Sequence, residues 1–193
     1  MIFYIMGKSA SGKDSIYKNL LKNHLNLKKV PIWTTRPKRD GEVDGVEYYF
    51  VDKNFLDNND KIIEKRIYHT VFGDWIYATI DDGHIKKNED YLMIGTLASY
   101  ESMKKYFGED NLYPIYIEID NNIRYERAKK REMEQKTPKL DEMERRFLAD
   151  EIDFSEENIK KANINKKYKN DILEDCLKEI IDDIKKIKSN VKI

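Results

Sequence analysis

The chain has 193 residues, the length of one ordinary domain and enough for a hydrophobic core. Lys plus Arg and Asp plus Glu are equal at 36 each, so no overall field attracts nucleic acid. One cysteine excludes an intramolecular disulfide framework, and no apolar run reaches the length of a membrane span. The first apolar run is too short for a signal peptide, so we expect a cytoplasmic protein without nucleic-acid or membrane partners and of unknown oligomeric state.

The first predicted elements are an apolar strand over Ile2–Met6 and a helix that begins near Ser15. Between them the sequence fits G-x-x-x-x-G-K, and strand, glycine loop and helix together are typical of a phosphate-binding loop. Glycines let backbone N–H groups point at phosphate oxygens, while the helix start and a lysine add positive charge. The residues expected to bind a nucleoside triphosphate here are Gly7, Lys8, Ser9, Ala10, Ser11, Gly12, Lys13, Asp14 and Ser15.

Asp14 departs from the pattern, which normally has Ser or Thr after the lysine to place a hydroxyl on Mg²⁺. A carboxylate is a good ligand for a hard cation, so Asp14 is a candidate metal ligand. Alternatively, Asp14 only complements the helix dipole in the first turn. The sequence leaves both interpretations open.

Further apolar runs of strand length follow at Val30–Trp33, Tyr91–Ile94 and Tyr113–Ile119, with helical patterns between and after them. Near-continuous apolar strands that alternate with helices predict an α/β fold with a parallel sheet. From Ile172 to Ile187, apolar residues recur at three- and four-residue steps, which predicts an amphipathic helix packed on the core. Cys176 lies on its apolar face, where we expect a buried structural thiol.

Two regions interrupt this alternation. Residues 34–82 combine aromatic and charged residues with period-two stretches, which predicts a small, partly antiparallel insertion. Residues from about 124 to 154 are very polar and have high helix propensity. They are either a solvated helical hairpin or a mobile lid.

A second anion site is predicted within the insertion. Arg36 and Arg39 are three residues apart, and guanidinium groups bind phosphate through paired hydrogen bonds. Tyr48 and Tyr77 can donate phenolic hydrogen bonds to the same oxygens. One site for a triphosphate and one for a smaller anion together indicate phosphoryl transfer.

Residues 34–50 read Thr-Thr-Arg-Pro-x-Arg-x-Gly-Glu-x-Asp-Gly-x-x-Tyr-x-Phe and closely resemble the GMP-binding segment of guanylate kinases. Weaker similarity continues along the chain. Ile62-Ile63-Glu64 resembles the family's Phe-Leu-Glu, and residues 73–79 resemble its Gly-Asn-Tyr-Tyr-Gly-Thr. Arg131 and Arg146 fall where the family has lid arginines, and Asn170-Asp171 matches its Asn-Asp near the adenine.

The resemblance implies a three-layer kinase fold with a core at 1–33, 83–123 and 156–193, a nucleotide-binding insertion at about 34–82 and a lid at about 124–155. It implies phosphoryl transfer from ATP, with Mg²⁺, to GMP. The implied catalytic residues are Lys13, Arg131 and Arg146, and Asn170 joins the ATP site. The implied GMP site contains Arg36, Arg39, Tyr48, Glu64, Tyr77 and Thr79, with Glu64 accepting from guanine N1–H and the exocyclic amine and Thr79 donating to its carbonyl.

Three departures leave other functions open. Ile32 stands where the family usually has a guanine-binding serine, the run 91–96 lacks the family's strand-end aspartates, and the spacing from Glu64 to Gly73 is longer. Because of the longer spacing, Glu64 is either the guanine-binding residue or an exposed residue in a charged stretch. A kinase of another phosphorylated small molecule, such as ribose 1,5-bisphosphate, and a non-catalytic guanylate-kinase-like binding module are the alternative functions.

Overall fold

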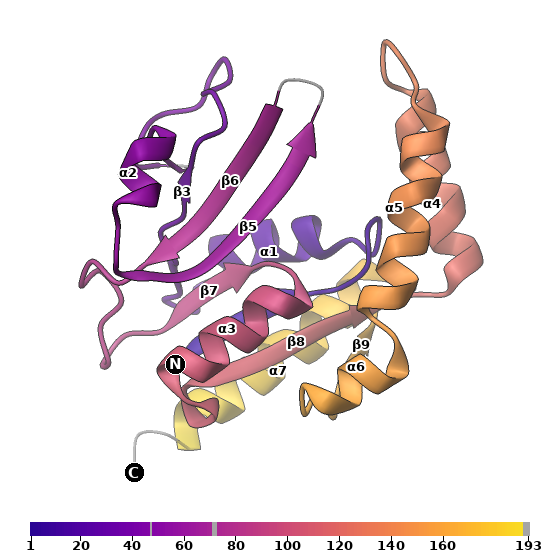
Figure 1. Ribbon diagram of the computed structural model, residues 1–193. Helices are drawn as coiled ribbons and strands as arrows, with labels where there is room; N and C mark the ends of the chain where they lie inside the picture. Colours follow the sequence, from indigo (N-terminus) through magenta and orange to yellow (C-terminus); the bar gives the residue numbers. More distant parts are fainter. Residues whose placement is uncertain (47, 71–72, 191–193) are drawn as a thin grey trace.

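The computed structural model describes residues 1–46, 48–70 and 73–190 (Figure 1). Glu47, inside the segment that resembles the family, and residues 71–72, inside the longer spacing, lie outside the described residues. The strands are β1 (Ile2–Met6), β2 (Lys28–Lys29), β3 (Trp33–Thr34), β4 (Tyr49–Phe50), β5 (Ile62–Thr70), β6 (Gly73–Ile80), β7 (Tyr91–Ile94), β8 (Leu112–Glu118) and β9 (Lys167–Lys169). The helices are α1 (Lys13–Lys22), α2 (Lys53–Asp57), α3 (Leu97–Phe107), α4 (Asn121–Met133), α5 (Leu140–Asp153), α6 (Glu156–Lys161), α7 (Leu173–Asn190) and the 3₁₀ turn η1 (Glu109–Asn111).

A five-stranded parallel sheet forms the centre, in the order β2-β7-β1-β8-β9. Successive side chains of a strand point to opposite faces, so β1 contributes to two separate cores. Tyr4 and Met6 pack with α3 and α6, whereas Phe3 and Ile5 pack with α1 and α7. Helices therefore cover both faces, which explains why β1 is apolar along its whole length and confirms the predicted α/β fold.

The predicted strand over Val30–Trp33 is wrong. The chain forms β2 just before this run and β3 at its end, and the two strands belong to different sheets. Pro31 has no N–H to give to a sheet ladder, so it interrupts the pairing where the chain crosses from the central sheet to the smaller one.

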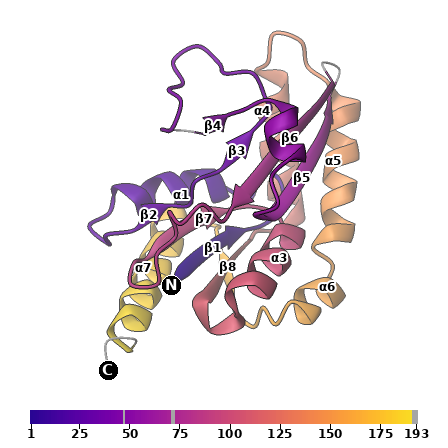
Figure 2. The same cartoon turned by 60° about the vertical axis from the view of Figure 1, so that its left-hand side comes forward.

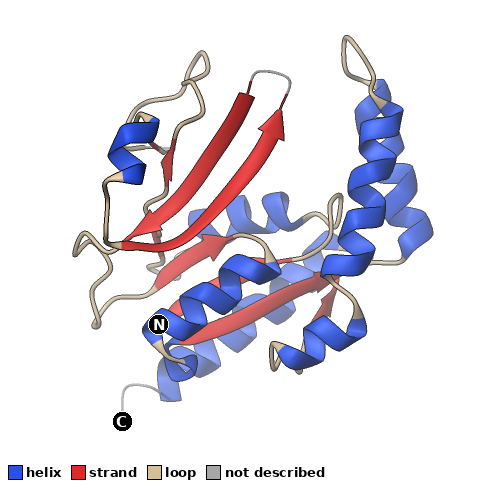
Figure 3. Ribbon diagram, in the orientation of Figure 1, coloured by secondary structure: helices blue, strands red, loops and turns tan. Residues whose placement is uncertain are grey.

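The smaller sheet and a pair of helices stand on either side of the turn that follows β1 (Figures 1 and 3). The sheet has the order β4-β3-β6-β5, with β3–β4 parallel and the other two pairs antiparallel. Its own apolar cluster includes Trp33, Leu56 and Ile76. The helical pair is α4 and α5, which pack along each other and stand across from this sheet in Figure 1. Figure 2 shows the same elements turned by 60°. None of the helices in the described part of the chain is long and apolar enough to cross a bilayer.

Helix α7 carries the apolar stripe that the sequence predicts. Cys176, Ile180 and Ile184 are buried in the core shared with β1 and α1. Burial raises the pKa of the Cys176 thiol to about 11, so the buried thiol stays protonated at neutral pH. Cys176 is a free cysteine and, as expected, a structural one.

Replacing Ile180, which is 0% exposed, tests how much this helix contributes to stability. We expect Ile180→Ala to lower the free energy of unfolding by about 2–5 kcal/mol, because the change leaves a cavity in a packed core. Ile172, which is 58% exposed, is the matched control, and Ile172→Ala should change stability by less than about 0.5 kcal/mol. Urea unfolding measures both, and equal losses would contradict the packing described.

Candidate active site

The segment from Gly7 to Lys13 forms the turn between β1 and α1, and its glycines allow the close approach this turn needs. A Cβ on Gly7 would lie 2.6 Å from the Ile117 carbonyl oxygen. Gly12 caps α1 with φ +88°, in the left-handed region that favours glycine. The first N–H groups of α1 have no acceptor within the helix itself, and a glycine turn before such a helix start is typical of phosphate sites.

Asn170 supports this loop through a hydrogen bond to its backbone. It follows β9, is buried, and its Nδ2 donates a hydrogen bond to the Ser11 carbonyl oxygen at 2.7 Å. A Cβ on Gly12 would lie only 2.2 Å from the same Nδ2. The structure thus places Asn170 directly against the loop, and the contact it makes is structural support for the backbone of the loop.

Lys13 projects beside the loop, where its Nζ lies 3.4 Å from the Lys8 carbonyl oxygen. Burial lowers the pKa of the Lys13 ammonium, and the carboxylates of Asp14 and Asp150 act in the opposite direction. Asp14 is exposed at the first turn of α1 and lines the same cavity as Lys13. The Lys13 ammonium and the Asp14 carboxylate therefore lie next to each other at the edge of the cavity.

Helix α5 contacts the loop through two carboxylates. Asp150 Oδ2 accepts a hydrogen bond from the Ser9 backbone N–H at 2.7 Å, and Glu151 Oε2 accepts one from Lys8 Nζ at 2.6 Å. Arg124 of α4 is fully buried and pairs with both carboxylates, with its Nη1 3.3 Å from Asp150 Oδ2. The helical pair is thus joined to the loop by charged contacts. Motif reasoning did not single out Arg124, because nothing in a polar helix marks one arginine as buried.

Arg36 lies just after β3 and is held in a fixed orientation. Arg36 is buried, its Nε donates to the Tyr77 hydroxyl at 3.1 Å, and its Nη2 donates to Glu42 Oε1 at 2.6 Å. The guanidinium carbon also lies 5.4 Å from the centre of the Tyr48 ring. The structure therefore brings together three of the four residues expected to bind the smaller anion. Arg39 is exposed, and its backbone N–H donates to Glu42 Oε2 at 2.7 Å.

Glu64 is buried on β5, so its alternative as an exposed residue is wrong. The hydroxyl of Thr79, on the neighbouring strand β6, donates to Glu64 Oε1 at 2.8 Å. Arg66, which the motif analysis did not select, lies two residues along β5 with its Nε 3.2 Å from Glu64 Oε2. Burial raises the pKa of the Glu64 carboxyl, and the charge of Arg66 lowers it.

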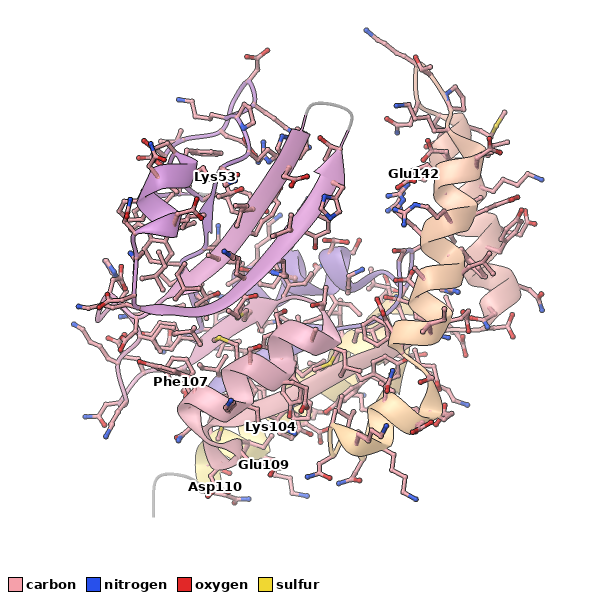
Figure 4. All side chains as sticks on the ribbon, in the orientation of Figure 1. Lys53, Lys104, Phe107, Glu109, Asp110 and Glu142 are labelled. Atoms are coloured by element: carbon pink, nitrogen blue, oxygen red, sulfur yellow. The ribbon has the colours of Figure 1, made fainter. Side chains whose placement is uncertain are left out.

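One cavity of about 920 Å³ lies between the loop, the small sheet and α5, and four of the expected acceptor-site residues are absent from its lining: Arg36, Arg39, Glu64 and Thr79. Its lining includes Gly7, Lys13 and Asp14 from the loop region, Tyr48, Arg66 and Tyr77 from the insertion, and Glu142, Arg145 and Arg146 from α5. Figure 4 shows Glu142 on the side of α5 that faces the small sheet. Arg131 does not line this cavity and instead lines a surface pocket together with Arg146. The loop and the Tyr48/Tyr77 end of the insertion therefore open into one space, with Arg146 at its edge.

Comparisons with known proteins agree on one family. The model of the family described as guanylate kinase matches residues 2–188. The chain is 31% identical over 136 residues to the guanylate kinase of Thermotoga maritima (63% of this chain, 62% of that protein). It is 32% identical over 111 residues to that of Helicobacter hepaticus (56% and 55%). These alignments cover less than two thirds of either relative.

A solved structure has the same fold. The crystal structure of guanylate kinase from Anaplasma phagocytophilum superimposes with a TM-score of 0.62 at 21% identity, covering 96% of this chain and 84% of that one. At this level of identity the match shows the fold alone.

The contact between Gly12 and Asn170 can be tested with a matched pair of glycines. Gly12 and Gly41 have φ of +88° and +84°, but a Cβ on Gly41 would meet nothing within 4 Å. Gly12→Ala and Gly41→Ala therefore introduce the same backbone strain, of about 1–2 kcal/mol, and only the first also displaces Asn170. We expect Gly12→Ala to weaken ATP binding at least about 10-fold by calorimetry, whereas Gly41→Ala leaves it unchanged. Unchanged affinity in Gly12→Ala would contradict the proposed loop geometry.

Proposed function

The chain belongs to the guanylate kinase family, and we propose that it transfers the γ-phosphoryl group of ATP to GMP, giving ADP and GDP. The observation that carries this proposal is one cavity lined both by the glycine loop and by Tyr48 and Tyr77, the second of which accepts a hydrogen bond from Arg36 just outside the lining. Two oxyanion sites that open into one space can hold a donor and an acceptor phosphate end to end. Positioning and charge stabilisation are most of what phosphoryl transfer requires.

On the donor side, the loop N–H groups and Lys13 would bind the β- and γ-phosphates of ATP. Lys13 stands at the loop with a pKa lowered by burial, and a bound polyphosphate would favour its charged form. Asn170 would support this site by holding the Ser11 carbonyl. The ATP site then consists of the loop residues 7–15 on a backbone that Asn170 keeps in place.

On the acceptor side, Arg36 and Arg39 would bind the GMP phosphate, with the hydroxyls of Tyr48 and Tyr77 as further donors. The Arg36 fork is already oriented by Tyr77 and Glu42, so little side-chain entropy is lost when a phosphate arrives. Glu64 would accept hydrogen bonds from guanine N1–H and the 2-amino group. Thr79 would hold Glu64 in position, since its hydroxyl donates to that carboxylate rather than pointing to a base.

Lys13, Arg131 and Arg146 would stabilise the charge on the transferring phosphoryl group. Arg146 already lines the cavity, whereas Arg131 would reach it only when α4 and α5 move toward the insertion. This movement is the lid function that we propose for residues of about 124–155, with residues of about 34–82 as the acceptor-binding insertion on the remaining core. Closure would exclude water and so suppress ATP hydrolysis.

Mg²⁺ would enter this site with ATP. Within the described residues no group of three or more His, Cys, Asp or Glu side chains could hold a metal. The donor set that is present fits an ion held by one carboxylate and the nucleotide phosphates, because Asp14 is an exposed carboxylate beside Lys13 at the cavity. When bound, Mg²⁺ would neutralise phosphate charge.

The role of Asp14 can be tested by replacing it with Asn, which keeps its size and removes its charge. If Asp14 binds the metal, Asp14→Asn should raise the Mg²⁺ concentration for half-maximal activity at least about 10-fold at fixed ATP. Asp40→Asn, at another acidic residue that is exposed, is the control. An unchanged Mg²⁺ requirement would show that Asp14 only complements the helix dipole.

The proposed reaction is tested by an ADP-release assay with ATP and Mg²⁺ against GMP, dGMP, AMP, CMP, UMP and ribose 1,5-bisphosphate. We expect rapid turnover with GMP and at least about 10⁴-fold lower kcat/KM with AMP, because Glu64 would find no N1–H donor on adenine. Turnover only with ribose 1,5-bisphosphate would instead identify the second kind of kinase. Absence of turnover with every acceptor would favour a binding module.

The cellular location of the protein stays a prediction.

Arg36 provides a sharper test of the two-site arrangement. Arg36→Ala removes a buried guanidinium at the acceptor phosphate site and should raise the KM for GMP about 10- to 100-fold while the KM for ATP stays within about 2-fold. Lys38→Ala, at an exposed residue of the same segment, is the control. Equal losses for both nucleotides, in a variant that still folds by circular dichroism, would contradict separate sites.

A further inference from the structure

A buried ion pair lies at the end of the cavity where the acceptor base would sit. Glu64 and Arg66 are two residues apart on β5, so their side chains leave the strand on the same face. Their side chains are only 1% and 14% exposed, and Arg66 lines the cavity together with Tyr48 and Tyr77. Arg66 pairs with Tyr77 across the β5–β6 ladder, which fixes it between Glu64 and the anion site around Arg36.

Guanine needs a hydrogen-bond donor as well as an acceptor from its site. Its N1–H and 2-amino group are donors that suit Glu64, while its 6-oxo oxygen is an acceptor. Thr79 has one hydroxyl proton, and the structure uses it for the bond to Glu64 Oε1. Ile32, which also lines the cavity, has an apolar side chain. Thr79, which the resemblance assigns to the carbonyl, is therefore not free to donate to it, and Ile32 has no donor to offer.

Most N–H groups of the Arg66 guanidinium take part in no hydrogen bond among the described residues. A guanidinium carries five N–H groups. Among the described residues, Nη2 donates to Glu64 Oε1 at 3.2 Å, and Nε is buried without a hydrogen-bond acceptor although Glu64 Oε2 lies 3.2 Å away. No hydrogen bond among the described residues uses Nη1, so its two N–H groups are the donors that a ligand oxygen in the cavity could meet. The side chain is thus incompletely satisfied within the protein and faces the cavity.

We propose that Arg66 is a specificity-determining residue that donates to the 6-oxo group of the acceptor purine, next to Glu64. This inference rests on the proposed function. The Glu64–Arg66 pair then presents an acceptor and a donor side by side, in the order that the N1–H and 6-oxo groups of guanine require. Adenine would place its 6-amino group against the guanidinium, so two donors would meet, and its N1 would face the carboxylate without a proton.

The charge of Arg66 also supports the role of Glu64. Burial raises the pKa of the Glu64 carboxyl and so favours its neutral form, whereas the neighbouring guanidinium favours the ionised form. An ionised carboxylate can accept from both N1–H and the 2-amino group. If Arg66 only kept Glu64 ionised, it would be a positioning residue. The experiment must therefore distinguish a hydrogen bond from Arg66 to the 6-oxo group from the effect of the Arg66 charge on Glu64.

The test compares Arg66→Met with unmodified protein on GMP, IMP and 6-thio-GMP. IMP keeps the 6-oxo group and lacks the 2-amino group, whereas 6-thio-GMP keeps N1–H and the 2-amino group but has a weakly accepting sulfur. We expect Arg66→Met to lower kcat/KM about 10- to 100-fold with both GMP and IMP, and by less than about 3-fold with 6-thio-GMP. The KM for ATP should not change. Equal losses with GMP and 6-thio-GMP would overturn the inference, because they would assign Arg66 to Glu64 alone.

Two controls keep the outcome interpretable. Lys65, the exposed neighbour of Arg66 on β5, lines a pocket on the other face of the sheet, so Lys65→Met should leave all three acceptors unaffected. Should Arg66→Met fail to fold, Arg66→Lys keeps the charge beside Glu64 and loses the fork, and its GMP to 6-thio-GMP ratio of kcat/KM should still fall at least about 5-fold. An unchanged ratio would overturn the inference. Absence of GMP turnover in unmodified protein would overturn the proposed function itself.

Discussion

The contact between the Asn170 amide and the Ser11 carbonyl supports the glycine loop between β1 and α1, and the proposed chemistry depends on that loop. Gly12 lets Asn170 approach so closely, and Gly7 lets the start of the loop lie against Ile117 of β8. The loop is thus held by strands on one side of β1, at the edge of the sheet where the first helix begins. Two of its N–H groups already have acceptors, Ser9 at Asp150 and Ser11 at the Lys8 carbonyl, so a polyphosphate would have to replace Asp150 to bind the Ser9 N–H.

Buried arginines with carboxylate partners recur around the cavity. Arg36 pairs with Glu42, Arg66 with Glu64, and Arg124 with the two adjacent acids of α5. Such pairs add little to stability once the cost of desolvation is counted, but they hold planar guanidinium groups in one orientation. The protein is neutral overall, and basic and acidic side chains alternate along the cavity as well. This arrangement favours anion binding at defined points rather than a general attraction to polyanions.

The sequence predicts best those elements whose local pattern suffices. β1 and β7 have the bounds expected from their apolar runs, because strands buried on both faces need apolar residues at every position. The sequence predicts strand boundaries and side-chain burial least well where contacts between distant parts of the chain determine them. Pro31 divides one apolar run between two sheets. Arg66 and Arg124 look like ordinary surface arginines in charged stretches, and only the folded chain reveals their burial. Glu64 could be assigned from a three-residue similarity, but its burial and its bond to Thr79 required the pairing of β5 with β6.

The central claim is that one cavity holds two nucleotides with their phosphates facing each other. A bisubstrate analogue that joins adenosine and guanosine through a chain of phosphates tests it most directly, by steady-state inhibition. If the loop and the arginine–tyrosine site lie end to end, the analogue will compete with both ATP and GMP and bind more tightly than either nucleotide. Competition with ATP alone would show that the second site does not lie in line with the first, and would contradict the arrangement.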